Sequence, residues 1–253
     1  MAPAAILHYH IFKNAGTSVD QVLEANFGAR WRNHDQVDPR GSVFADEVER
    51  IMAAESSLVA LSSHQMRPPL PDLGRIVLPI VFLRHPLDRI RSVYRFDRRR
   101  GPMTKAAEMA CSHDFPGYVA AVMAALPHLV SNAQVMLLTD AWDRAANRRL
   151  DIGPEGHFER ARAFLQTVPV VGVVEDYDRS WRRLLHLIAE HHPTFRVAAG
   201  ERRNVDLDRE ARLEERLDRM REELGDDLYA ELEARNSLDF ALHDAAARRS
   251  SVP

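Results

Sequence analysis

Residues 5–18 have the sequence AILHYHIFKNAGTS, an apolar run followed at once by a lysine, a glycine and two hydroxyl residues. The apolar part, residues 6–11, is typical of a buried parallel strand. Residues 18–27 then show apolar positions at helical spacing. A strand, a loop and a helix are therefore predicted in that order. The first turn of such a helix has unpaired backbone N–H groups at the positive end of its dipole, so the preceding loop can bind a phosphate.

The same alternation of strand and helix continues along the chain. Segments with helical spacing separate further apolar runs, which are predicted as strands at residues 58–61, 76–83 and 168–174. Alternation of this kind implies crossover connections and a parallel sheet with helices on both faces. The fold class is therefore α/β, a P-loop-like parallel sheet in a three-layer α/β/α arrangement. A long, charged amphipathic helix is expected over residues 206–232, with a break conceivable at Gly225.

Size and charge limit the function classes. The 253 residues suit a single domain, residues 1–253, with a core over about 5–205 and a C-terminal helical extension over about 206–245. The 34 Lys and Arg nearly balance 37 Asp and Glu, so the chain has no overall positive field that would bind a nucleic-acid backbone. Any anion site must be local. Oligomeric state stays open.

Membrane insertion and secretion are not expected. No run approaches the roughly 20 consecutive apolar residues that cross a bilayer, and the first residues lack the basic and long apolar parts of a signal peptide. The single cysteine, Cys111, excludes an intramolecular disulfide framework. A soluble, cytoplasmic protein is therefore expected.

The loop after the first strand has the chemistry of a phosphate site. Gly16 lets the backbone approach an anion closely, and the Thr17 and Ser18 hydroxyls can cap the helix and donate to phosphate oxygens. Lys13 adds a positive charge. In a Walker loop the lysine directly follows the last glycine, whereas here it precedes the glycine, so an ordinary ATP or GTP loop is disfavoured.

A second anion site is predicted after the strand at 76–83. Arg84 lies at the carboxyl end of that strand, where open α/β sheets bind ligands. Pro86 suits the first turn of a following helix, and Ser92 falls about two turns into it. A planar guanidinium with a hydroxyl suits a terminal phosphate. Arg89, on the same helix, is expected to brace it.

The two motifs together resemble those of the sulfotransferases that use 3′-phosphoadenosine 5′-phosphosulfate. Residues 10–18, HIFKNAGTS, are similar to the 5′-phosphosulfate loop of the carbohydrate-modifying branch, HIPKTAGTS, with Phe12 and Asn14 as the departures. Residues 84–94, RHPLDRIRSVY, resemble the 3′-phosphate motif of the family, with His85 where the family usually has aspartate. Weaker matches lie at residues 131–134 and 171–177.

The resemblance implies a function and a set of site residues. It implies transfer of a sulfuryl group from that donor, with 3′-phosphoadenosine 5′-phosphate as the product, to an acceptor hydroxyl on a saccharide. Donor-binding residues on this basis are Lys13, Asn14, Ala15, Gly16, Thr17, Ser18, Arg84, Ser92 and Arg203. Lys13 would also act in catalysis. His64, which follows the second strand, matches the histidine that takes the acceptor's proton, and an imidazole suits that task because its ordinary pKa is about 6.5.

Other functions stay open from the residues alone. One alternative is a P-loop-like kinase, which would need Mg²⁺ and ATP. Another is a non-catalytic protein that binds a nucleotide or a glycan on the same fold. His8 and His10 alternate along a strand without a cysteine or carboxylate at ligand spacing, so no metal is predicted. Acceptor specificity is assigned to the loops at 30–41 and 99–115.

Overall fold

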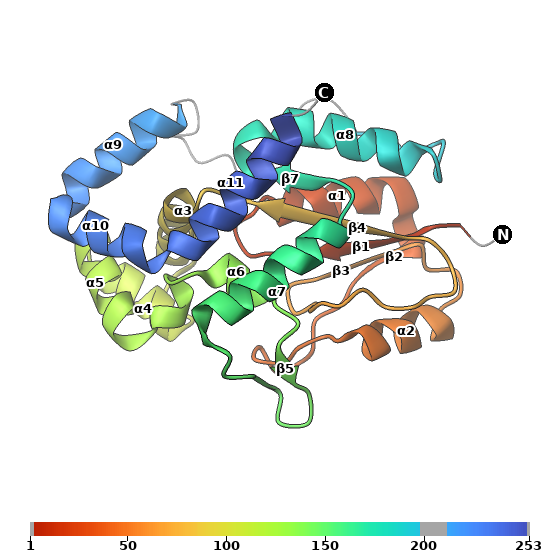
Figure 1. The fold of residues 1–253 in the computed structure, drawn as a ribbon, viewed down its shortest axis with the longest axis horizontal. Helices are drawn as coiled ribbons and strands as arrows, with labels where there is room; N and C mark the ends of the chain where they lie inside the picture. The colour runs from red at the N-terminus through yellow and green to blue at the C-terminus, as the bar shows by residue number, and fades with distance from the viewer. Residues whose placement is uncertain (1–2, 198–211, 252–253) are drawn as a thin grey trace.

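The central sheet confirms the predicted α/β class. The computed structural model describes residues 3–197 and 212–251 (Figure 1). Within these residues lies a five-stranded, fully parallel sheet of order β2-β3-β1-β4-β7. Its strands are β1 (Ala5–Tyr9), β2 (Trp31–Asn33), β3 (Ala60–Ser63), β4 (Val77–Leu83) and β7 (Val171–Val173).

Helices cover both faces of the sheet, because successive side chains of a buried strand point to opposite sides. On β1, Ile6 faces the layer of α1 (Gly16–Phe27) and α8 (Tyr177–Ala189), and Leu7 faces the other layer. Both side chains are fully buried. The second layer contains α2 (Ala45–Ala54), α6 (Ala133–Leu138), α7 (Gly153–Thr167) and α11 (Ser237–Ser251) (Figure 1).

A separate helical cluster stands beside the sheet, at the left in Figure 1. It packs Tyr118 and Leu232 among other apolar side chains. Its helices are α3 (Pro86–Arg100), α4 (Lys105–Ser112), α5 (Phe115–Ala125), α9 (Leu213–Leu224) and α10 (Asp226–Arg235). A small hairpin of β5 (Trp142–Asp143) and β6 (Arg148–Arg149), and three 3₁₀ turns, Gly28–Arg30, Pro127–Leu129 and Val174–Asp176, complete the described elements.

Several predicted boundaries need correction. Strand β2 lies inside the segment expected to be a loop at 30–41, and the second predicted strand is shifted to Ala60–Ser63. The charged C-terminal stretch is interrupted at Gly225, the position at which the sequence left a break open, because Gly225 adopts a φ of 77°, a left-handed value that separates α9 from α10. Residues 206–211 lie outside the described part. The last helix, α11, packs on β7 in the second layer.

The order of the strands determines where a ligand can bind. The chain passes from β1 to β2 and β3 on one side and then crosses to β4 on the other side of β1. Ligands of open α/β sheets bind outside the carboxyl ends of strands at such a reversal. The loops that follow β1 and β4 therefore face the same crevice.

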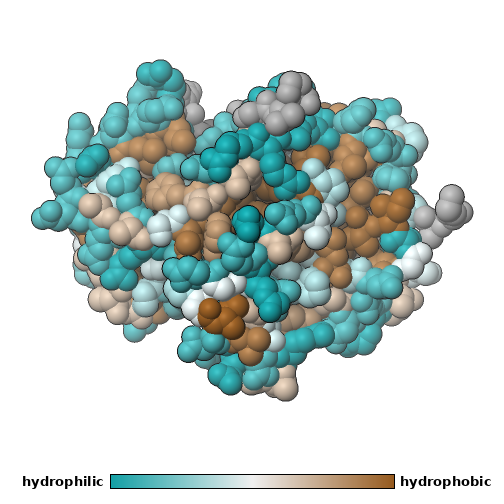
Figure 2. Space-filling view, viewed as in Figure 1, coloured by the Kyte–Doolittle hydropathy of each residue, from teal (hydrophilic) through white to brown (hydrophobic). Residues whose placement is uncertain are grey.

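The surface is mostly hydrophilic on the face drawn in Figure 2, with apolar residues in several separate areas. Large apolar side chains that are exposed come from different loops: Val37, Ile76, Met103, Leu150 and Ile152. Among residues 3–197 and 212–251, no helix combines the length and the apolar character needed to span a bilayer.

Candidate functional site

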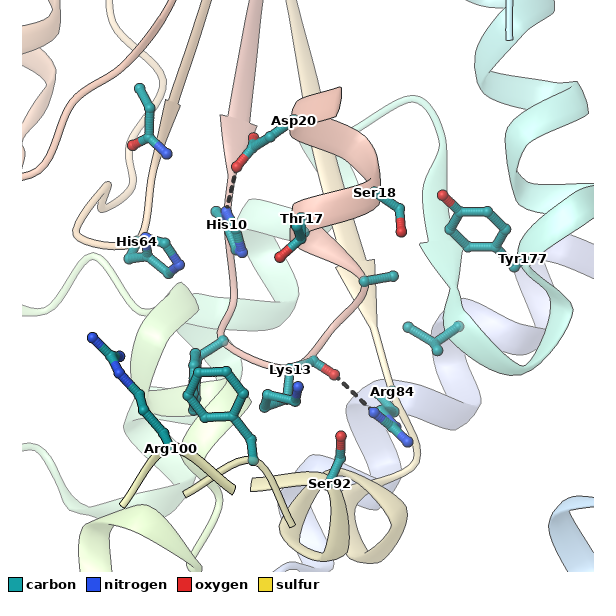
Figure 3. A pocket seen from close by; sticks show the side chains of 16 residues that line it. His10, Lys13, Thr17, Ser18, Asp20, His64, Arg84, Ser92, Arg100 and Tyr177 are labelled. Carbon is teal, nitrogen blue, oxygen red and sulfur yellow. Dashed lines mark hydrogen bonds and ion pairs between the residues drawn. The ribbon is translucent and has the colours of Figure 1, made fainter. Parts of the chain in front are cut away.

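A cavity of about 390 Å³ opens at the carboxyl ends of β1 and β4 (Figure 3). It brings together eight of the residues predicted from the sequence: Lys13, Ala15, Gly16, Thr17, Ser18, His64, Arg84 and Ser92. Asn14 does not line it. Arg203 lies outside the described residues. Further lining residues are His10, Phe12, Asp20, Asn33, Phe96, Arg100, Val174 and Tyr177.

The loop after β1 presents the start of α1 to the cavity. Lys13 and Ala15 have left-handed φ angles of 68° and 64°, and α1 begins at Gly16 without a side-chain cap. Thr17 and Ser18 lie inside the first turn, so the expectation that their hydroxyls cap the helix is wrong. Both hydroxyls face the cavity instead (Figure 3). The N–H of Ser18 donates to the Ala15 carbonyl at 3.0 Å, so the uncapped turn presents the N–H groups of Gly16 and Thr17 to an anion.

Gly16 is required by a neighbouring ring. A Cβ built at this position would lie 2.0 Å from Cδ2 of His10, which is impossible without a shift of the ring. The sequence explanation, close approach of an anion to the backbone, is therefore incomplete. Gly16 also lets the His10 ring lie against the beginning of α1, at the edge of the cavity.

Phe12 and Asn14, the two positions at which the loop differs from the sulfotransferase motif that it resembles, each hold the loop in place. The Phe12 ring packs edge-on against Phe96, with 5.2 Å between centroids, and the Phe12 carbonyl accepts from Arg89 Nε at 3.1 Å. Arg89 therefore braces α3 against this loop. Asn14 Nδ2 donates to the Phe82 carbonyl at 2.8 Å and to Gln134 at 2.7 Å. The side chain of Asn14 thus points into the protein, which corrects its assignment to donor binding.

Gln134 joins both predicted anion sites from behind. Its Oε1 accepts from Asn14 Nδ2 at 2.7 Å and from the Arg84 backbone N–H at 3.0 Å, while its Nε2 donates to the Arg84 carbonyl at 2.8 Å. Asp239 of α11 accepts from the backbone N–H of Gln134 at 3.0 Å and of Val135 at 2.8 Å. One buried amide therefore determines the spacing between the β1 loop and the end of β4.

Replacing Gln134 with alanine should therefore destabilise the protein. The change leaves Asn14 Nδ2, the Arg84 N–H and the Arg84 carbonyl each one partner short in the interior, and a buried unpaired group costs about 1–3 kcal/mol. We expect a loss of at least about 2 kcal/mol in the free energy of unfolding, measured by denaturant titration. The exposed Gln166→Ala on α7 should change it by less than about 0.5 kcal/mol. Equal losses in both variants would contradict this role.

Arg84 is held at the cavity by a chain of charges. Its Nε lies 2.8 Å from Asp88 Oδ2, and its Nη1 donates to the Lys13 carbonyl at 3.1 Å (Figure 3). Arg216 of α9 also binds Asp88, at 3.0 Å. Burial would raise the pKa of Asp88, but the two arginines outweigh burial and lower it. Asp88 therefore stays ionised, and Ser92 lies one turn further along α3 with its hydroxyl toward the loop (Figure 3).

A carboxylate reaches the position after Arg84 from another strand. The backbone N–H of His85 donates to Glu175 Oε1 at 2.9 Å, and His243 of α11 lies 3.0 Å from Glu175 Oε2. Burial would lower the pKa of His243, but Glu175 outweighs it and raises the pKa. Glu175, which follows β7, thus binds both the backbone of His85 and the side chain of His243, and the ion pair with His243 fastens α11 there.

His64 is paired with a carboxylate that the sequence did not single out. Its Nδ1 lies 2.9 Å from Asp35 Oδ2, while Asp35 Oδ1 accepts from the backbone N–H of His64 at 2.9 Å and from Ser63 Oγ at 2.8 Å. Burial would raise the pKa of Asp35, but the bonds from His64 and Ser63 outweigh burial and lower it to about 2. An ionised Asp35 fixes the tautomer of His64 and leaves Nε2 as the proton acceptor.

A second pairing of histidine and aspartate lies beside the first. Asp20 of α1 accepts from His8 Nδ1 at 2.8 Å and from His10 Nδ1 at 2.9 Å. Burial would raise the pKa of Asp20, but the two histidines outweigh it and lower the pKa. The ligand atoms of these three residues lie within 4.8 Å of one another, a spacing that a metal ion could use. Because each Nδ1 already has its carboxylate oxygen, we interpret the group as a hydrogen-bonded triad, and the absence of a metal stays a prediction.

Comparison with known proteins gives the evolutionary context of this site. An uncharacterized protein of Archaeoglobus fulgidus is 33% identical, over 94% of this chain and 93% of the archaeal protein. This chain belongs to the same family. No family model matches the chain. The archaeal relative has no assigned activity, so a function for the family has to be inferred from the chemistry of the cavity.

Sequence reasoning missed three residues of this family member's site. Asp35 lies in a loop without a motif, so no local signal could have found it. His10 was given no role in the site, because its alternation with His8 along a strand indicated no metal site, although it lines the cavity. Asp20 did carry a signal, since it is a charged residue among the buried positions Val19 and Val22 of α1.

The free energy of unfolding should fall in mild acid, because His10 is buried and resists protonation in the folded protein. Burial lowers the pKa of His10 from 6.5 to about 4, against the opposing hydrogen bond to Asp20. The unfolded chain therefore binds a proton in this window that the folded chain does not, so the free energy of unfolding falls as pH drops below 6.5. The loss approaches about 1.4 kcal/mol per pH unit.

His10→Asn, which keeps a donor for Asp20 without a titrating ring, should make that dependence less steep, while His85, whose pKa burial also lowers to about 4, retains its own contribution. Urea titrations at several pH values between 7 and 4.5 would measure the slope. Equal slopes in the parent and in His10→Asn would show that His10 becomes protonated in the folded protein.

Proposed function

We propose that the chain binds 3′-phosphoadenosine 5′-phosphosulfate and transfers its sulfuryl group to an acceptor hydroxyl on a saccharide. One observation carries the proposal. The uncapped start of α1 and the pair Arg84 and Ser92 face one cavity from neighbouring strands, with His64 at its side. A doubly phosphorylated nucleoside needs two anion sites on one ligand-sized cavity.

The sides of the cavity suit the parts of this donor. Lys13, whose Nζ lies 4.6 Å from the centroid of the Phe96 ring, and the N–H groups of α1 would bind the 5′ end. Arg84 and Ser92 would bind the 3′-phosphate. Val174 and Tyr177 supply an apolar wall that suits the adenine ring. Few carboxylates line the cavity to repel an anionic donor. Asp20 is the one carboxylate among the described lining residues, and each of its oxygens is hydrogen-bonded to a histidine.

The proposed step is an in-line displacement at sulfur. The acceptor oxygen forms a bond to sulfur as the bond from sulfur to the phosphate oxygen of the donor breaks, and the nucleotide bisphosphate leaves. His64 Nε2 takes the hydroxyl proton, while Asp35 holds Nδ1. Lys13 and the loop N–H groups neutralise the charge that grows on the departing phosphate, a form of help that usually outweighs other single contributions.

A comparison of ligands tests the proposal against a Mg-dependent kinase. The donor and its desulfated product should each raise the melting temperature of the protein, because a ligand that binds only the folded state stabilises it. Mg-ATP should not match them, since a kinase needs carboxylates to hold the metal. A larger shift with Mg-ATP than with 3′-phosphoadenosine 5′-phosphate would overturn the proposal.

Transfer itself needs a labelled donor. Radiolabelled sulfate should pass from the donor to at least one member of a panel of mono- and oligosaccharides. Donor binding without transfer to any acceptor would favour the non-catalytic alternative.

The exposed, free Cys111 fits a reducing compartment, and a cytoplasmic location is part of this proposal.

A further inference from the structure

Two imidazoles lie face to face at the edge of the cavity. The ring centroids of His10 and His64 are 3.8 Å apart, with an interplanar angle of 29°. His10 follows β1 and His64 follows β3, so their contact is made only by the fold. Each ring uses Nδ1 to bind a carboxylate, Asp20 or Asp35. The other nitrogen of His64 faces the cavity, and that of His10 lies against Gly16 at the cavity's edge (Figure 3).

His10 is the more firmly held of the two rings. It is 6% exposed, whereas the His64 side chain is 38% exposed. Asp20 binds its Nδ1, and the absence of a Cβ at Gly16 lets its other edge lie against α1. His8 stacks on it from the far side, with 5.0 Å between centroids. His10 therefore offers a fixed face against which His64 can rest.

A proton on His64 would create a cation against that face. Cations within about 6 Å of an aromatic face are attracted to it, and a carboxylate behind the face adds a favourable charge. Burial lowers the pKa of His10 to about 4, so His10 is uncharged at neutral pH. The protonated His64 ring would therefore not be stacked on a second positively charged ring. Other charged or titratable groups surround the two rings. His8, Asp20 and Asp35 contact them, and the guanidinium of Arg67 donates to the His64 carbonyl at 3.3 Å. Lys13, Arg84 and Arg100 line the same cavity.

We propose that the Asp20–His10 pair positions His64 and stabilises the imidazolium that forms when His64 accepts the acceptor's proton. The inference rests on the proposed function, in which His64 is the base. His10 and Asp20 are positioning residues, because they act through His64. The proton moves from the acceptor hydroxyl to His64 Nε2, and Nδ1 keeps its hydrogen bond to Asp35 throughout.

The first test follows His64 directly and needs no activity. In protein with ¹⁵N-labelled histidine, the titration midpoint of His64 should fall in Asp20→Asn and in His10→Asn, because the imidazolium loses the carboxylate or the supporting ring. Asp20→Glu, which keeps the charge, should stay closer to the parent. The matched control is His157→Asn, which removes another histidine that is 6% exposed but does not line the cavity. It should leave the midpoint unchanged.

The second test uses turnover. With the radiolabelled donor and a saccharide that the parent accepts, Asp20→Asn and His10→Asn should each lower turnover by about 10- to 100-fold, the cost typical of a displaced reacting group. The acidic limb of the pH profile should move to lower pH, while calorimetry shows an unchanged affinity for 3′-phosphoadenosine 5′-phosphate. A loss of stability alone would not shift that limb.

The two tests separate this inference from the proposed function. If the parent transfers no sulfuryl group but the His64 midpoint still falls in the variants, the role of the Asp20–His10 pair is retained and the sulfotransferase proposal is removed. An active parent whose variants keep both the midpoint and the acidic limb would overturn the role of Asp20 and His10. Should one variant fail to fold, the other carries the same comparison.

Discussion

Lys13→Ala is expected to lower the turnover of sulfuryl transfer by about 10²- to 10³-fold, the cost of removing one group that stabilises charge in a transition state. Lys13 lines the cavity beside the start of α1, and its Nζ lies over the Phe96 ring. The charge on the leaving phosphate grows as the reaction proceeds, so turnover should suffer more than the affinity for the donor. Single-turnover transfer of radiolabelled sulfate would measure the effect.

The chain provides a matched control for this variant. Lysine occurs at two positions, 13 and 105, and Lys105 begins α4 without lining the cavity. Lys105→Ala should leave turnover unchanged. Equal turnover in Lys13→Ala and the parent would refute the assignment of Lys13 to the departing phosphate.

Arg84→Ala should act mainly on binding. Truncating one partner of a buried, hydrogen-bonded charge pair typically costs about 2–5 kcal/mol, so we expect the affinity for 3′-phosphoadenosine 5′-phosphate to fall by at least about 30-fold. Turnover at saturating donor should change much less, because Arg84 positions the ligand and does not touch the reacting atoms. Calorimetry with the product nucleotide would measure the loss.

A stability measurement must accompany that variant. Arg84 also binds Asp88 and the Lys13 carbonyl, and Arg216 remains to neutralise Asp88 when Arg84 is removed. Arg162→Ala on the exposed side of α7 removes a paired arginine away from the cavity and should leave the affinity unchanged. Unchanged affinity in Arg84→Ala would mean that Arg84 serves only the internal contacts.

The sequence predicted the parts of the fold that depend on local patterns. Apolar runs marked β1, β3, β4 and β7, since strands buried on both faces are apolar throughout. Proline at the start of α3 predicted that helix, which spans Pro86–Arg100. The three-residue strand β2 went unpredicted because its pairing with β3, at the edge of the sheet, determines it and no apolar run marks it.

For the candidate site too, the sequence predicted only those parts that depend on local patterns. Anion sites could be predicted because the chemistry behind the prediction is local: glycine, lysine and hydroxyl residues lie at one strand-to-helix turn, and an arginine lies at the end of a second strand. The partners of His64 and His10 could not be predicted, since Asp35 and Asp20 approach them through the folded chain. Asn14 was misassigned for the same reason, because its amide binds Gln134, which is remote in sequence.

The sequence by itself thus determined the α/β class and the order of the two motifs for which anion binding is proposed. Only the tertiary structure decided that Lys13, Arg84 and His64 share one cavity, and that each histidine there is bound to a carboxylate. The physical reason is the separation along the chain over which each kind of interaction acts. Backbone preferences and apolar periodicity act between near neighbours in the chain, whereas hydrogen bonds and ring contacts at the carboxyl edge of the sheet form between segments that meet only after the strands have aligned.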